Sequence, residues 1–184
     1  MALAKALING GSEHRKFLRQ IFVSIDITAP LYIWKEFDTY KVGTVANSTS
    51  TMHTIEKKPI VFDCFETDDY FPISADGTNF VEKSLIPYLE HLRNYYLTLK
   101  NMGDNENAYK AWKELIRWLP ESWLQTRTVT MNYENAFSMY HQREFHKLNE
   151  WSGKRDAELN NMINIIENLP YMKDFLSLPA NDNN

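Results

Sequence analysis

The stretch LQTRTVTMNYENAFSMYHQREFH, residues 124–146, contains the clearest change of local pattern in the chain. Its first part, residues 124–131, is rich in threonine and valine and is typical of a strand. A helix is expected to follow over residues 135–150. Asn132 and Arg143 are eleven positions apart, about three turns at 3.6 residues per turn, so a helix would bring them onto nearly the same face.

Working outward from this stretch, apolar periodicity predicts the remaining elements. They are a helix at residues 2–8, a strand at 21–27, a helix from Pro30 with Thr28 as its candidate cap, a strand at 60–65, helices at 81–99 and up to Trp118, and a last helix at 159–166. Strand and helix signals mix without a regular βαβ alternation, so we predict an α+β fold. We expect one domain over residues 1–178 and a polar tail at 179–184.

Composition excludes several classes of function. The 184 residues carry a formal net charge of −4, which gives no positive field for a nucleic-acid backbone. A single cysteine, Cys64, excludes an intramolecular disulfide and a thiolate metal cluster, and the scattered histidines favour no metal site. No apolar run reaches the roughly 20 residues of a membrane span, and no signal peptide is evident, so a cytoplasmic protein is expected.

Residues 39–54 form the first candidate site. Seven of these sixteen positions are serine or threonine, and Lys41 and Gly43 lie among them. A loop of this composition offers hydroxyls, backbone amides and one cation, which together can hold phosphate oxygens. An ordinary polar surface loop explains the same composition.

The segment from Asn132 to Lys147 forms the second candidate site. An asparagine and an arginine that point the same way suit recognition of a base edge and a phosphate. A solvated helix face, with charged neighbours around Glu144, explains these residues as well.

Two blocks of the sequence, taken in order, resemble a known family. The first begins at Gly11-Ser12-Glu13-His14, continues through the expected strand, and reaches Ala29-Pro30 and the helix after it. The second contains Arg117-Trp118-Leu119-Pro120, then Asn132 with Arg143 eleven residues later. Both blocks are similar in order and spacing to flavin-dependent thymidylate synthases. The resemblance covers over half of the chain and implies that family's fold, a central, mostly antiparallel sheet flanked by helices.

The family's signature positions carry other residues here. Thr39-Tyr40-Lys41 stand where the family has Arg-His-Arg, and Glu36 replaces a glutamine that contacts substrate. A threonine in place of a guanidinium removes a charged phosphate contact of about 1.5–3 kcal/mol. Position by position, the resemblance implies two sets of contacts. The cofactor would be bound by His14, Tyr40, Lys41, Asn47 and Asn132, and the substrate by Glu36, Ser48, Thr49, Ser50, Thr51, Arg117 and Arg143.

The resemblance also implies an activity. Family members are homotetramers that bind FAD and dUMP, take a one-carbon unit from methylenetetrahydrofolate and reduce the flavin with NADPH. This chain is similar to short variants from viruses of bacteria and is expected to be a homo-oligomeric enzyme acting on a deoxypyrimidine monophosphate. The pattern identifies no catalytic residue. Two other readings stay open: a module that binds a pyrimidine nucleotide without turnover, and an assembly protein with Tyr140 and Trp151 exposed at subunit contacts.

Overall fold

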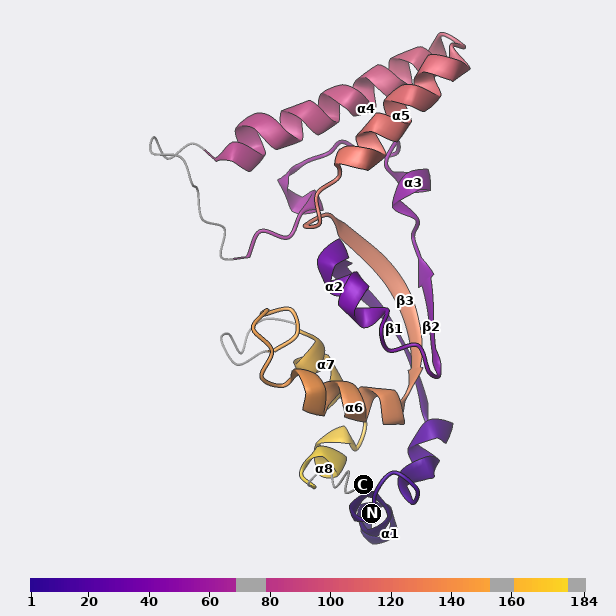
Figure 1. Cartoon of the computed structure of the whole chain (residues 1–184), viewed down its shortest axis with the longest axis vertical. Coiled ribbons are helices and arrows are strands. Elements are labelled where there is room, and N and C mark those ends of the chain that lie inside the picture. The colour runs from indigo at the N-terminus through magenta and orange to yellow at the C-terminus, as the bar shows by residue number, and fades with distance from the viewer. Residues whose placement is uncertain (69–78, 153–160, 179–184) are drawn as a thin grey trace. The chain divides into compact units, whose positions relative to one another are not determined.

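The computed structural model describes residues 1–68, 79–152 and 161–178, so the first two residues of the helix predicted at 159–166 and the expected polar tail lie outside the described residues. Figure 1 shows the helices and strands in the order in which they follow along the chain. The α-helices and strands, in chain order, are α1 (Ala2–Asn9), β1 (Phe22–Pro30), α2 (Leu31–Phe37), β2 (Thr44–Ser48), α3 (Thr51–Thr54), α4 (Ile86–Asn101), α5 (Asn105–Trp118), β3 (Leu124–Asn132), α6 (Tyr133–Arg143), α7 (Met162–Glu167) and α8 (Met172–Leu176). Shorter turns are the 3₁₀-helices η1 (Arg15–Gln20) and η2 (Phe62–Cys64) and the π-helical η3 (Val81–Leu85).

The three strands form one sheet in the order β1-β3-β2, which makes β3 the central strand (Figure 1). Side-chain hydrogen bonds join β1 to β3 at Thr28–Thr126 (2.7 Å), Asp26–Thr128 (2.5 Å) and Ser24–Thr130 (3.0 Å). From one pair to the next, the residue number decreases along β1 and increases along β3, so these two strands are antiparallel. The intervening side chains of β1 turn toward the apolar side, where Ile27 is buried. The predicted α+β fold is confirmed.

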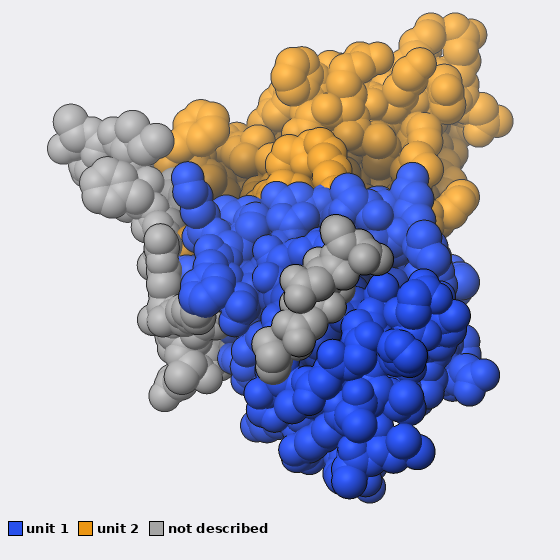
Figure 2. Space-filling view, turned by 60° about the horizontal axis from the view of Figure 1, so that its bottom comes forward, with its two compact units in different colours: residues 1–27, 36–47, 128–184 blue, residues 28–35, 48–127 orange. Residues whose placement is uncertain are grey.

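The contacts divide the chain into two compact units (Figure 2). Unit 1 comprises Met1–Ile27, Glu36–Asn47 and Thr128–Asn184, and unit 2 comprises Thr28–Lys35 and Ser48–Arg127. The expectation of a single domain over residues 1–178 stays a prediction.

In unit 2, α4 and α5 pack together as a helical hairpin (Figure 1). Asp104 begins α5, where its carboxylate accepts a hydrogen bond from the Asn107 backbone N–H (3.2 Å). Leu89 of α4 and Leu115 of α5 are fully buried. They share an apolar cluster with Ile55, Ile60, Phe65 and Trp123. This cluster stabilises the hairpin against the rest of its unit.

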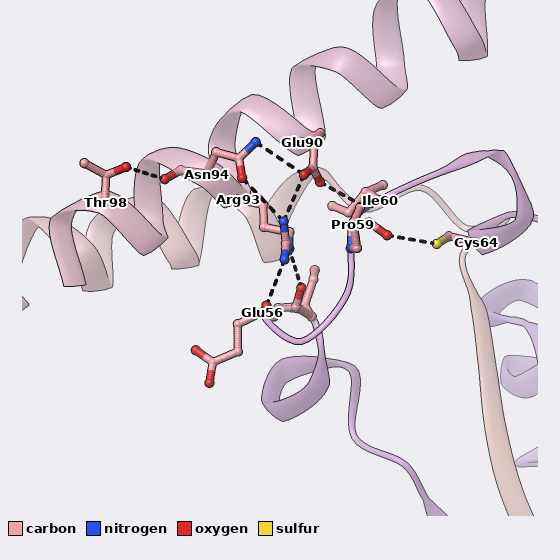
Figure 3. A network of polar contacts seen from close by, with 9 residues as sticks. Glu56, Pro59, Ile60, Cys64, Glu90, Arg93, Asn94 and Thr98 are labelled. Carbon is pink, nitrogen blue, oxygen red and sulfur yellow. Dashed lines mark hydrogen bonds and ion pairs between the residues drawn. The ribbon is translucent and has the colours of Figure 1, made fainter. Parts of the chain in front are cut away.

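A buried arginine fixes the segment before η2 to α4 (Figure 3). Arg93 is only 7% exposed, and its Nε and Nη2 donate to the carbonyls of Ile55 (3.0 Å) and Glu56 (2.9 Å). Its Nη1 donates to Glu90 (2.9 Å), whose other oxygen accepts from the Ile60 backbone N–H (2.8 Å). The buried charge is thereby paired and hydrogen-bonded, as burial requires.

In unit 1, a second buried arginine joins η1 to the start of α6. Arg15 donates from Nε to Glu134 (3.0 Å), and the two side chains are 5% and 14% exposed. The Arg15 guanidinium also lies over the Phe137 ring, 5.1 Å from its centroid. Phe137, Ile166 and Phe175 bring the apolar faces of α6, α7 and α8 into the core of this unit.

Several predicted elements are confirmed: the helix at the N-terminus, the strand now seen as β1, the hairpin helices α4 and α5, and β3 followed directly by α6. The expected cap of the helix after Pro30 is wrong. Thr28 lies within β1, where its hydroxyl pairs with Thr126, and α2 starts at Leu31 directly after the strand.

The expected loop at residues 39–54 contains β2 and α3 instead. The β-branched residues Thr44 and Val45 suit a strand, and β3 supplies the neighbouring backbone. Directly after β2, the Thr49 backbone N–H donates to the Thr126 carbonyl (3.1 Å). Of the seven serines and threonines in residues 39–54, only Thr44 and Ser48 lie within β2.

The predicted strand at residues 60–65 is wrong. Residues Phe62–Cys64 form η2, and only Phe65 makes an isolated bridge, to Trp123. The Ile60 N–H is taken by Glu90, so this apolar run is buried through single side chains and has no strand partner. Cys64 is half-buried in the turn rather than in a strand.

The helix predicted over residues 135–150 begins earlier and ends sooner, as α6 stops at Arg143. Beyond it, the Ser152 hydroxyl donates to the Glu144 carbonyl (3.0 Å), and a His146 ring nitrogen accepts from the Leu148 N–H (3.2 Å). In a longer helix the Leu148 N–H would donate to the Glu144 carbonyl. Here each of these two backbone groups is hydrogen-bonded to a side chain instead, and the helix ends. The last predicted helix corresponds to α7, and α8 after Pro170 was not expected.

Candidate functional site

The junction of β3 and α6 positions the first side chains of the candidate site. Asn132 ends the strand and caps the helix: its Oδ1 accepts from the Asn135 backbone N–H (2.9 Å), and it is 7% exposed. The Asn135 side chain donates from Nδ2 to the Val42 carbonyl and to the Thr44 hydroxyl (2.7 Å). The start of α6 therefore binds the segment that leads into β2.

Gly43 lies in that segment with φ of +73°, in the left-handed region that favours glycine. A Cβ atom added at this position would collide with the carboxamide nitrogen of Asn132. The backbone at Gly43 thus approaches Asn132 more closely than any other residue type would allow.

Arg143 ends α6 and contacts the same part of the chain three turns further on. Its Nε donates to the Tyr40 hydroxyl (2.9 Å), and its Nη1 donates to Glu36 Oε2 (2.9 Å). The guanidinium lies over the rings of Trp151 and Tyr40, 4.9 and 5.7 Å from their centroids. A planar, weakly hydrated guanidinium suits such a stacked and hydrogen-bonded position.

We name Glu36, Tyr40, Arg143, His146 and Trp151 the Arg143 cluster. His146 Nε2 lies 3.4 Å from Glu36 Oε2, and Trp151 is fully buried. The expectation that Trp151 is an exposed subunit contact is therefore wrong. Its indole N–H has no hydrogen-bond partner within the described part of the chain. An unsatisfied buried donor is uncommon and marks a place where a water or ligand oxygen would be stabilised.

Tyr140 lies on α6 close to this cluster and is half-buried rather than an open contact residue. Burial, together with a hydrogen bond from its hydroxyl to Glu167 (2.8 Å), raises the pKa of Tyr140 to about 12. The phenol therefore stays protonated at neutral pH and joins α6 to α7.

The structure brings five of the sequence-predicted site residues into one part of unit 1: Glu36, Tyr40, Lys41, Asn132 and Arg143. Lys41 is exposed and forms no ion pair with any described residue. Asn47 is exposed in β2, and His14 lies at the start of η1. Neither has a hydrogen bond to the Arg143 cluster among the residues described.

The other predicted residues belong to unit 2. Thr49 donates from its hydroxyl to the Thr126 carbonyl (3.2 Å), and the Thr51 hydroxyl accepts from Gln125 (3.2 Å). Ser48 ends β2, and Ser50, two residues later, has a positive φ of 48° at the N-cap position of α3. Arg117 pairs with Glu114 on α5. Within their unit these groups already have protein partners or structural roles.

Three further residues of the site have no predicted binding role of their own: Gly43, His146 and Trp151. An isolated glycine in a threonine-rich segment was the one available signal for Gly43.

Among the described residues, no three histidine, cysteine, aspartate or glutamate side chains form a group that could hold a metal ion. No helix in the described ranges is long and apolar enough to cross a bilayer. The Arg143 cluster offers a guanidinium and aromatic rings, and Asn132 and Asn135 at the start of α6 add amides.

No protein-family model and no curated protein matches this sequence. Solved structures do match. The flavin-dependent thymidylate synthase ThyX of Helicobacter pylori, solved with FAD and dUMP, aligns with a TM-score of 0.50 at 16% identity, covering 94% of this chain and 80% of that chain. A second structure of ThyX from the same organism with the same ligands gives a TM-score of 0.54 at 16% identity, covering 95% and 79%. Similarity at this identity concerns architecture. The chain has the fold of flavin-dependent thymidylate synthases.

Proposed function

We propose that this protein binds a pyrimidine deoxynucleotide, of the dUMP type, at the face of unit 1 formed by the Arg143 cluster and Lys41. One observation carries the proposal. Asn132 and Asn135 at the start of α6, and Arg143 at its end, all contact residues 36–44. A rigid helix thus aligns amides, a guanidinium and aromatic rings along one segment, as a nucleotide site requires.

The individual groups match the parts of such a ligand. Lys41 is the only cation in residues 36–47 and has no carboxylate partner among the described residues, so its ammonium is available to a phosphate. The half-buried Tyr40 ring suits stacking on a planar base. The fold neighbours solved with dUMP support the choice of a pyrimidine nucleotide.

A flavin-dependent enzyme is the second candidate, favoured by those same neighbours, which were solved with FAD. When bound, the flavin would supply the hydride chemistry, and NADPH and methylenetetrahydrofolate would be the co-substrates. The donor set of the cluster fits a nucleotide monophosphate better than the diphosphate of FAD. Arg143 is already paired with Glu36. Lys41 is the one lysine or arginine in residues 36–47, so a single unpaired cation remains for the phosphates. In that case Lys41, Tyr40 and Asn132 would contact the cofactor.

The test is isothermal titration of the full chain with dUMP, dCMP and FAD, together with the visible absorption spectrum of the freshly purified protein. Binding of a nucleotide without flavin supports the binding protein, and a yellow protein that also binds dUMP supports the enzyme. Lys41→Ala should weaken dUMP binding about tenfold, the loss of one charged contact. Lys110→Ala, an exposed lysine on α5 in unit 2, is the matched control and should leave it unchanged. No heat with any of the three ligands would reject both candidates.

The predicted homotetramer stays a prediction, and size-exclusion chromatography with light scattering measures it directly.

A further inference from the structure

The positive charge of Arg143 is neutralised inside the protein. Glu36 Oε2 accepts from Arg143 Nη1 at 2.9 Å and also lies 3.4 Å from His146 Nε2. The side chains of Glu36, Arg143 and His146 are 34%, 20% and 21% exposed, so the group is partly open to solvent. The Arg143 guanidinium and the His146 ring nitrogen thus both approach one carboxylate of the chain itself.

A carboxylate in this position competes with any anionic group of a ligand. It is an acceptor only, and it already forms the charge-assisted bond that a phosphate oxygen would form with the guanidinium. A phosphate brought to Arg143 would also be repelled by the Glu36 charge next to it. An uncharged carbonyl or hydroxyl meets neither obstacle.

We propose that Glu36 determines which part of a ligand can approach Arg143: it excludes phosphate and admits an uncharged, hydrogen-bonding edge. For the nucleotide this rests on the proposed function, where the base or sugar then faces Arg143 and the phosphate is bound by Lys41. The exclusion of anions by Glu36 is a property of the chain alone and is testable without any nucleotide.

Glu36→Gln is the informative variant because glutamine has nearly the same shape and its carbonyl still accepts from Arg143, while the negative charge is gone. The probe is inorganic phosphate, titrated at constant ionic strength and followed by ³¹P NMR. The pH is held constant, so that only the phosphate concentration changes during the titration. Glu121→Gln, which removes a carboxylate from the exposed Lys35–Glu121 pair in unit 2, is the matched control.

We expect Glu36→Gln to bind phosphate about tenfold or more tightly than the wild type, the effect of one charge-assisted hydrogen bond. The double variant Glu36→Gln/Arg143→Gln should return to the wild-type value, because the gain depends on the guanidinium. Glu121→Gln should match the wild type. Circular dichroism and the unfolding midpoint establish that each variant is folded.

A purely structural ion pair makes a different prediction: Glu36→Gln would lower stability and leave phosphate affinity within twofold of the wild type. That result, in a folded variant, overturns the inference. Parallel titrations with dUMP separate this inference from the proposed function. If Glu36→Gln gains phosphate affinity while neither protein binds dUMP, the nucleotide proposal fails and the role of Glu36 stands. If the wild type binds dUMP and Glu36→Gln gains no phosphate affinity, the nucleotide proposal stands and the proposed role of Glu36 fails.

Discussion

Substituting Gly43 by alanine tests how closely the segment before β2 is held against α6. Gly43 has φ of +73°, and an added Cβ would meet the Asn132 carboxamide. The left-handed conformation costs a non-glycine residue about 1–2 kcal/mol. Displacing Asn132 also weakens its cap of α6, which contributes about 1 kcal/mol. We therefore expect Gly43→Ala to lower the free energy of unfolding by roughly 2–3 kcal/mol.

Gly103 is the matched control. It has nearly the same backbone conformation, with φ of +78°, but an added Cβ would meet nothing within 4 Å. Gly103→Ala should cost only the backbone contribution, about 1–2 kcal/mol. Urea unfolding followed by circular dichroism gives both values, with the slope of the transition as a check on its cooperativity. If Gly43→Ala is no more destabilising than Gly103→Ala, the close contact with Asn132 is not a significant constraint.

Two further predictions concern unit 1. Arg15→Met leaves the carboxylate of Glu134 buried without its partner and should lower the free energy of unfolding in urea by about 3 kcal/mol. The control Lys16→Met breaks only an exposed ion pair and should lower it by less than about 1 kcal/mol. Equal effects would show that the buried pair is unimportant. The raised pKa of Tyr140, about 12 against an ordinary value near 10, means that its stabilising contribution is complete below pH 10 and is lost as the pH rises toward 12. The stability difference between the wild type and Tyr140→Phe should therefore shrink over that interval in unfolding experiments, and a constant difference would contradict the assignment.

Much of the fold follows from local periodicity. The alternation in β1 and the three- and four-residue spacing of α4 and α5 predict these elements because each has one continuous buried face. The strand β2 could not be predicted in the same way, since its pairing partner β3 lies far along the chain and its own residues resemble a polar loop. Residues 60–65 are the opposite case. Their apolar character indicates burial, but the Glu90 side chain takes the backbone N–H that a strand would have used.

The site was predicted to a similar extent. The spacing of Asn132 and Arg143 predicted that both would lie on nearly the same helix face, and in the structure both lie against residues 36–44. The pair between Arg143 and Glu36 joins positions 107 residues apart, so no local pattern indicates it. Trp151, among polar neighbours in the sequence, is buried because it packs against Arg143 and stacks on Phe37, with ring centroids 6.3 Å apart. Such burial depends on tertiary contacts alone.

The central position of β3 also has a consequence for the order in which the chain folds. Its two neighbours, β1 and β2, both precede the α4–α5 hairpin, and β3 follows it. The hairpin depends on contacts between adjacent helices, which form early, whereas every strand pairing must close a long loop. We therefore expect the α4–α5 hairpin to form first. Its formation shortens the loop that must close before β3 can pair with β1 and β2. The rate-limiting step would then be this insertion, and the helices would set how quickly the sheet is completed.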